Sequence, residues 1–300
     1  MAYAGYDFST GQGIRNYVID RASEVDAAST QFLESLETDI MAAYIGLLEE
    51  IEAPWAKKRP PGVIVTTPEI TTGTVTLTQG STSGTFSSGP AASVAGRKIY
   101  ADDDGIVCRI SAHTAAATAF TLDANYPGAG GSGLAYHLFQ DEYDLASDFL
   151  VPRSRPFLKD CEGAYQIDLV SEAELDSWYP YPPQQSGTTL QACAFVGDKK
   201  LRVAPWPRDY RRWEYEYNHH PGTLAFDGTA NDAVIVKPAQ DGVVIALLAL
   251  ANILVSKNDD RFTVFAGAAK DKLDKMNGIS RKFQRPRLWV RSRHNVSARR

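Results

Sequence analysis

The residues best suited to binding a metal are five histidines, and none has a partner at ligand spacing. They are His113, His137, His219, His220 and His294. No His-x-x-x-His pattern occurs, and no cysteine stands at zinc-site spacing from a histidine. We interpret the adjacent pair His219 and His220 as a loop at a strand exit, with a metal or protonation role as the alternative.

Two groups of carboxylates are close enough in sequence to suggest calcium binding or acid–base catalysis. The run 102–104 (Asp-Asp-Asp) precedes Gly105, but EF-hand spacing is missing, and Asp and Gly also favour tight turns. Asp141, Glu142 and Asp144 could mimic a catalytic pair, yet nothing in the sequence holds them on opposite sides of a sugar bond. We interpret these groups as a turn and as a polar stretch that leaves a strand.

Motifs for nucleophilic or phosphate chemistry are missing from the sequence. There is no Gly-x-Ser-x-Gly elbow, P-loop or kinase signature, and Cys108, Cys161 and Cys193 are scattered. An odd number of cysteines fits no closed disulfide framework, so we expect small buried thiols in a reducing compartment. We therefore predict no catalytic residue, no cofactor and no metal, and a protein that is not an enzyme.

Exposed aromatic side chains could instead form a sugar-binding platform. Trp178 begins an aromatic and proline-rich run, and Trp206 and Trp213 follow it. Aromatic residues also dominate protein cores and interfaces, and we favour that interpretation here.

Charge is distributed unevenly along the chain. The net formal charge is −5, which argues against a duplex-binding protein. Residues 22–56 contain only acidic charges, and residues 281–300 contain only basic ones. The acidic segment is either a solvated helix face or the lining of a channel that repels DNA phosphates. The candidate lumen-lining residues are Glu34, Glu37, Asp39, Glu49 and Glu50.

The basic C-terminal segment carries the strongest functional signal, because aromatic and aliphatic residues stand between its arginines. Such a segment can dock in a groove, where arginines pair with carboxylates and aromatic rings fill pockets. Contact with nucleic acid and a plain disordered end are the alternatives. The candidate contact residues are Arg281, Lys282, Phe283, Arg285, Arg287, Leu288, Trp289, Arg291 and Arg293.

Hydrophobic periodicity predicts helices at both ends of the chain. Apolar residues recur at three- and four-residue spacing over 32–51, and a helix that is apolar on all sides follows Pro238. A further helix is expected over 260–277, with Gly278 as its cap. The longest apolar run, 243–255, is too short to span a bilayer, and we expect no signal peptide.

The middle of the chain is typical of strands. Residues 63–139 are rich in Thr, Ser, Gly and Val in short alternating runs, as in a small β-barrel or sandwich. Ser171 and Glu174 form a capping box, 190–203 reads as a hairpin, and 212–218 alternates with its aromatic residues on one face.

These elements predict an α+β fold, in which a helical domain built from N- and C-terminal helices carries an inserted small antiparallel β-barrel or sandwich domain. The helices at the two ends must pack together, because neither could bury its apolar face alone. The expected parts are an N-terminal arm (1–13), N-terminal helices (14–58), the inserted β-domain (62–140), a hairpin with C-terminal helices (141–279) and an extended basic tail (280–300).

Several segments resemble the head-to-tail adaptor (connector or neck) proteins of tailed bacteriophages. They are 72–81, 94–99, 120–128 and 135–145 in the β-rich region, the helix end at 54–55, and the strand 201–207. The resemblance implies a ring, usually of twelve copies, that joins the portal protein to a tail or nozzle protein. It also implies that 281–300 docks on the portal and that genomic DNA passes through the lumen without specific binding.

The resemblance places the protein in the virion neck, and in the host cytoplasm during assembly, with no membrane partner. Three other functions remain open: a tail-associated carbohydrate-binding component, a DNA-contacting virion protein, and a tail-tube or terminator subunit.

Overall fold

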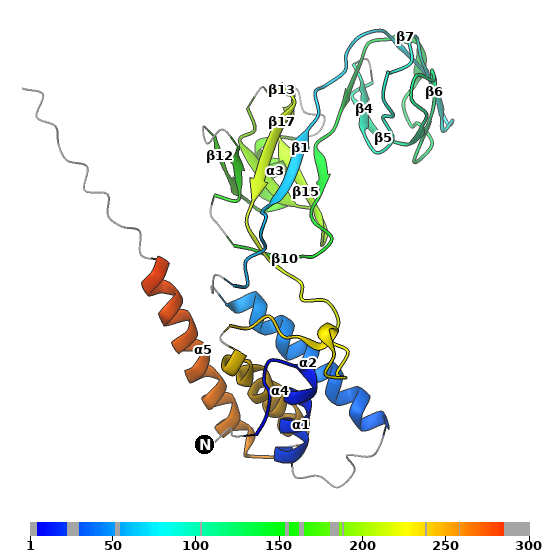
Figure 1. Cartoon of the computed structure of the whole chain (residues 1–300). Helices are drawn as coiled ribbons and strands as arrows, with labels where there is room; N and C mark the ends of the chain where they lie inside the picture. The colour runs from blue at the N-terminus through cyan, green and yellow to red at the C-terminus, as the bar shows by residue number, and fades with distance from the viewer. Residues whose placement is uncertain are drawn as a thin grey trace, which may run out of the picture. The chain divides into compact units, whose positions relative to one another are not determined.

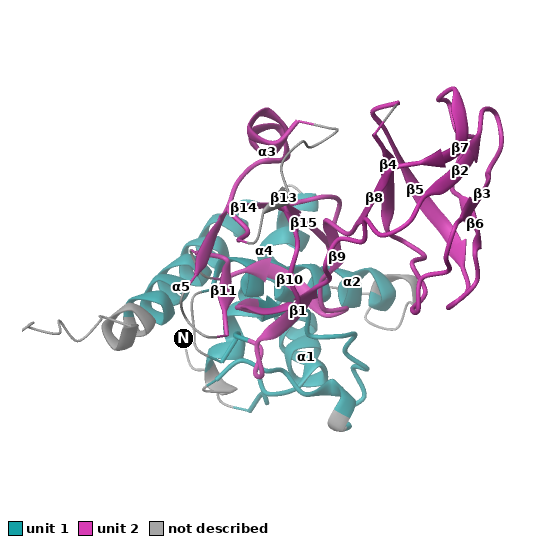
Figure 2. Ribbon diagram, turned by 90° about the horizontal axis from the view of Figure 1, so that it is seen from above, with its two compact units in different colours: residues 1–57, 218–300 teal, residues 58–217 magenta. Residues whose placement is uncertain are grey.

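The chain divides into a helical unit, residues 1–57 with 218–300, and a β-rich unit, residues 58–217 (Figures 1 and 2). This division comes from a computed structural model. The residues it describes are 5–22, 30–51, 55–102, 104–153, 156–161, 165–180, 186–187, 189–237, 239–257 and 259–284.

The helical unit is built around one buried helix. Helix α4 (Val243–Ser256) buries residues on nearly every side, as its apolar sequence predicts. Helices α1 (Gly11–Ala22), α2 (Thr30–Glu50) and α5 (Phe262–Gln284) pack against it. Two short 3-10 turns, Ala230–Asp232 and Ala239–Gly242, precede α4. The apolar face predicted over 32–51 is confirmed, since Leu36, Ile40 and Leu47 are buried.

Two polar side chains from the C-terminal half cap the N-terminal helices. The fully buried Asp232 carboxylate accepts hydrogen bonds from the backbone N–H groups of Gln12 (2.7 Å), Phe226 (2.9 Å) and Gly228 (3.1 Å). It therefore places a negative charge at the positive end of α1. The Asn218 amide donates to the carbonyl oxygens of Leu48 (2.7 Å) and Ile51 (3.1 Å), at the C-terminal end of α2. Carbonyls that a helix end leaves without partners are thus satisfied.

The first β-sheet, sheet A, has seven strands in the order β1-β17-β11-β12-β14-β15-β9. Its core contains aromatic residues from alternating positions, including Trp213, Tyr215 and Tyr217, which confirms the predicted common face. Its strands are β1 (Gly62–Thr66), β9 (Glu142–Asp144), β11 (Leu158–Asp160), β12 (Gln166–Leu169), β14 (Ala192–Phe195), β15 (Lys200–Ala204) and β17 (Arg211–Tyr215).

Local signals in this sheet behave as predicted. Strands β14 and β15 form an antiparallel hairpin, and Gly197 in its turn has a φ of +67°. Helix α3 (Glu172–Trp178) begins with the predicted capping box between Ser171 and Glu174. It packs over β14 and β15, where Leu175 contacts buried alanines.

The second β-sheet, sheet B, also has seven strands, in the order β7-β2-β3-β6-β5-β4-β8, all paired antiparallel. Apolar residues alternate with exposed ones, so one face forms a separate core. Its strands are β2 (Val75–Thr78), β3 (Ser83–Phe86), β4 (Lys98–Ala101), β5 (Ile106–His113), β6 (Ala119–Leu122), β7 (Gly130–Leu134) and β8 (Tyr136–Phe139).

The predicted fold class is wrong, because strands dominate the described residues. The chain does not carry one small β-insert: sheet B is inserted between β1 and β9 of sheet A. Residues 141–217, assigned from sequence to the helical part, mostly complete sheet A. Short paired strands complete the β structure: β10 (Phe149–Pro152) with β18 (Tyr217–His219), and β13 (Ser186–Gly187) with β16 (Trp206–Pro207).

The last helix is also longer than predicted. Helix α5 passes through Gly278, the expected cap, and ends at Gln284. Among the described residues, no helix combines the length and apolar character needed to cross a membrane.

The cap on α1 gives a first testable prediction. The variant Asp232→Ala should lower the free energy of unfolding by roughly 3 kcal/mol, because three backbone N–H groups lose the fully buried carboxylate that accepts from them. Chemical denaturation followed by circular dichroism would measure the loss. Asp227→Asn is the matched control, since that exposed carboxylate accepts hydrogen bonds from Thr229, two residues along the chain. Equal stability of both variants would contradict the capping role.

Candidate functional site

Most of the described histidines have local structural contacts. His113 accepts from the backbone N–H of Val94 (3.2 Å), and its other nitrogen lies 2.9 Å from the Ala117 carbonyl. His219 lies 3.2 Å from the Ala56 carbonyl, and His220 accepts from the N–H of Gly222. His220 therefore stabilises the turn that it begins, and His219 contacts the segment that follows α2. His294 lies outside the described residues.

His137 has a different environment, because both of its ring nitrogens face carboxylates. Nδ1 contacts Glu69, and Nε2 lies 3.1 Å from Oδ1 of Asp102. Arg208 in turn lies 3.8 Å from Glu69. The imidazole ring therefore lies between Glu69 and Asp102, and each of its nitrogens is already occupied by a carboxylate. In the part of the chain that the structure describes, no group of three or more potential ligands could hold a metal ion.

Asp102 and Asp104, the described members of the acidic run, lie in turn conformation before β5, and Asp104 orders a neighbouring loop. Asp104 accepts from the Tyr126 hydroxyl (2.7 Å) and from the N–H of Gly130 (3.2 Å). These bonds, the Tyr126 bond first, hold the pKa of Asp104 below its usual value. Asp103 lies outside the described residues.

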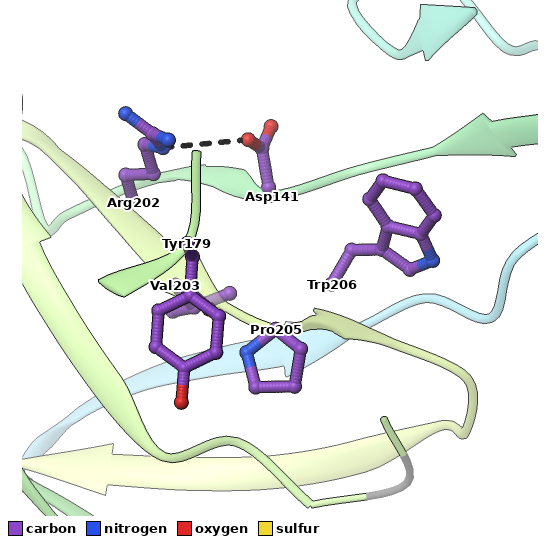
Figure 3. Close-up of a pocket in the computed structure, with 7 residues that line it drawn as sticks. Asp141, Tyr179, Arg202, Val203, Pro205 and Trp206 are labelled. Carbon is purple, nitrogen blue, oxygen red and sulfur yellow. Dashed lines mark ion pairs between the residues drawn. The ribbon is translucent and has the colours of Figure 1, made fainter. Parts of the chain in front are cut away.

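The most concentrated charge cluster lies where the chain passes from sheet B back to sheet A. Asp141, only 4% exposed, stands directly before β9. Nζ of Lys98, from sheet B, lies 3.1 Å from its Oδ1, and Nε of Arg202, from sheet A, lies 3.6 Å from its Oδ2 (Figure 3). Lys98 also pairs with Glu142 (2.5 Å), and Arg202 with Asp176 (2.6 Å). One cation from each sheet thus meets the same carboxylate.

The two adjacent carboxylates of this cluster differ in protonation behaviour. Loss of hydration on burial raises the pKa of Asp141, although Lys98 and Arg202 oppose it. Burial also acts on Glu142, but hydrogen bonding and charge from Lys98 outweigh it, so its pKa is lowered. Such opposite shifts can serve acid–base catalysis. Here, however, the cavity beside Asp141, lined by Tyr179, Arg202 and 203–206, has a volume of about 10 Å³, which leaves room for about one water molecule.

A larger depression, of about 370 Å³, opens beside Lys98 and Glu142. Its lining also includes Arg109, Asp123 and Cys108. The lysine is already paired with two carboxylates, and burial raises the pKa of the Cys108 thiol. Neither side chain is therefore prepared as a nucleophile.

The tryptophans proposed for sugar binding do not form a platform. Trp206 is 3% exposed and stacks on Phe139, with ring centroids 4.2 Å apart, and Trp213 is 1% exposed in the core of sheet A. Only Trp178, at 55%, is accessible among these three. The core interpretation therefore holds for Trp206 and Trp213.

The candidate lumen residues lie on α2. Glu34, Glu49 and Glu50 are exposed, Asp39 is partly buried, and Glu37 pairs with Arg15 at 2.6 Å. Their role in a channel stays a prediction.

The candidate contact residues of the tail begin within α5. Positions 281–283 belong to its last turn and are therefore helical and not extended. The remaining candidates, Arg285, Arg287, Leu288, Trp289, Arg291 and Arg293, lie outside the described residues.

Sequence reasoning missed the cations of the junction, although it named their acidic partners. Lys98 begins one short strand of mainly apolar residues, and Arg202 lies in the middle of another. A charged side chain in such a strand indicates that an oppositely charged side chain lies nearby, but only the order of the strands shows which residue that is.

A comparison of the chain with protein-family models and with curated proteins found no match.

The junction gives a second prediction. Asp141→Asn should lower the free energy of unfolding by roughly 2 kcal/mol, less than for an isolated buried pair, because Lys98 keeps Glu142 and Arg202 keeps Asp176. Denaturant titration with tryptophan fluorescence would measure it. Asp144→Asn, at an exposed position of the following strand, β9, is the control. An unchanged midpoint for Asp141→Asn would show that the pairing contributes nothing.

A third prediction concerns pH. Burial acts to raise the pKa of Asp148, but hydrogen bonds from Lys58 (2.6 Å) and Tyr217 (2.7 Å) outweigh it, so the pKa lies below its unfolded value. The associated stability is therefore present above about pH 4 and lost as the pH falls through the folded pKa. The stability difference between the native protein and Asp148→Asn, measured by denaturation across acid pH, should shrink in that window. A difference independent of pH would refute the assignment.

Proposed function

We propose that this chain is a structural virion protein, a head-to-tail adaptor that forms a ring between the portal and the tail of a tailed bacteriophage. The observation that carries the proposal is the course of α5. Met276 of this helix is buried, the helix continues to Gln284, and the basic segment 285–300 follows directly in the sequence. A basic segment with aromatic anchors at the end of a packed helix is suited to binding another protein.

The character of the described charge clusters supports an assembly role. The buried charges of the β-rich unit are paired with each other, and the cavity beside Asp141 cannot hold a substrate. Such clusters fix the arrangement of two sheets, which a load-bearing subunit requires. The burial of Trp206 and Trp213 removes most of the support for a carbohydrate-binding component.

In this proposal the partners are the portal protein, further copies of the chain, usually twelve in a ring, and a tail or nozzle protein. Repetition around a closed ring multiplies weak contacts, so each tail needs only modest affinity. Genomic DNA passes through the lumen without specific binding.

The test is binding to the portal ring encoded in the same genome. The full chain should co-sediment with portal rings, and deletion of 285–300 should abolish co-sedimentation while leaving the circular dichroism spectrum and unfolding midpoint unchanged. A variant with Lys270→Gln and Lys275→Gln, exposed cations on α5, is the control for general loss of positive charge. Undiminished portal binding by the truncated chain would refute the docking role. Salt-sensitive duplex DNA binding that depends on 285–300, without portal binding, would favour the DNA-contacting alternative.

A further inference from the structure

The outward face of α2 combines carboxylates with partly exposed apolar side chains. Glu34, Glu49 and Glu50 are exposed, and Met41 and Ile45 are half-buried. The helical repeat places Met41 and Ile45 next to Glu34 and Glu49, along the edge of the side that packs in the unit. This face therefore offers both negative charge and an apolar strip.

The carboxylates of this face have no cation within the described residues. Glu37 pairs with Arg15, but Glu34, Asp39, Glu49 and Glu50 form no ion pair in this part of the chain. Partial burial raises the pKa of Asp39, and no positive charge among the described residues opposes this shift. An incoming basic segment would supply that charge.

The chain itself carries a segment of matching chemistry. Residues 22–56 contain only acidic charges, and 281–300 contain only basic ones, with Leu288, Trp289 and Val290 between arginines. Arginines would pair with the carboxylates, while the apolar residues cover Met41 and Ile45. The occupant is thus identified by charge and by apolar content together.

The geometry of the helical unit favours a tail from another molecule. Helix α4 lies between α2 and α5 in both views (Figures 1 and 2), and α2 packs on α4 with its buried side. The acidic face of α2 therefore points away from α4, and so from α5, where the tail begins. Extended, 285–300 spans roughly 50 Å, which is enough to reach a neighbouring copy.

We infer that the outward face of α2 is a docking surface for the basic C-terminal segment of a second copy of this chain. The contact joins two different surfaces of one chain, so it propagates head to tail and can close a ring. The inference rests on the proposed function in one respect. In a ring, the α2 face of one copy would bind the tail of its neighbour until that tail binds the portal.

The first experiment measures binding of a fluorescent peptide of residues 281–300 to the full chain by anisotropy. The triple variant Glu34→Gln, Glu49→Gln and Glu50→Gln should weaken binding about ten-fold, as expected for the loss of several exposed ion pairs. Asp198→Asn, Asp271→Asn and Asp274→Asn together remove the same number of exposed charges elsewhere and should leave binding unchanged. Equal effects of the two triple variants, or no effect of either, would overturn the inference.

The second experiment identifies the molecule that supplies the tail. Trp289 is replaced by the photoreactive benzoylphenylalanine in isotopically light full chain, which is mixed with heavy chain and irradiated. Crosslinks between light position 289 and heavy α2 peptides are expected. Crosslinks only within the light chain would show a tail folded onto its own helix, and crosslinks that avoid α2 would leave that face free to line a DNA channel. Either result would overturn the inference.

Failure of this inference is separable from failure of the adaptor role. If the chain binds no portal ring, the peptide and crosslinking experiments still test whether the tail of one copy binds α2 of another. If portal rings bind but α2 does not take the peptide, only the contact between copies is refuted.

Discussion

The N-terminal helices of the helical unit depend on capping hydrogen bonds from side chains that are distant in sequence. Asp232, which caps the start of α1, stands 220 residues beyond the backbone N–H of Gln12, and Asn218 satisfies the end of α2. The N-terminal helices therefore cannot reach their final state until the chain has completed the β-rich unit and returned. The return point is fixed by a backbone bridge between Lys57 and Asn218.

Each inserted part of the chain also has its two ends paired with each other. Gly62 pairs with Tyr215 where sheet A begins and ends, and Ile70 pairs with Leu138 beside sheet B. An insertion whose two ends are adjacent can be added without disturbing its host. At the innermost junction, Asp141 meets Lys98 of sheet B and Arg202 of sheet A. Burial makes this cluster costly to form, so its contribution is to specify how the sheets meet.

The proposed adaptor role draws on the distribution of charge in both units. The buried charges of the β-rich unit pair with each other, and the α2 carboxylates that form no ion pair among the described residues have the opposite sign to the basic segment after α5. Surfaces of opposite charge steer association and select partners even where each ion pair is weak. One tail with two successive acceptors, a neighbouring copy and then the portal, would couple ring formation to docking.

The sequence by itself determined the local elements. The buried helix α4, the capping box at Ser171, the hairpin of β14 and β15 and the aromatic face of 213–217 follow from periodicity, caps and turn residues, which act over a few positions. The charge asymmetry between 22–56 and 281–300 is likewise a property of composition.

Only the tertiary structure decided how far the β-structure extends and which charges meet. Residues 141–217 mostly join a sheet whose first strand begins at Gly62. The residue pattern of a strand does not show which distant strand it pairs with. For the same reason Asp141 was visible as an acid, but Lys98 and Arg202 became its partners only through strand order. The helical course of α5 past Gly278 shows that a cap residue expresses a preference, which the rest of the helix can override.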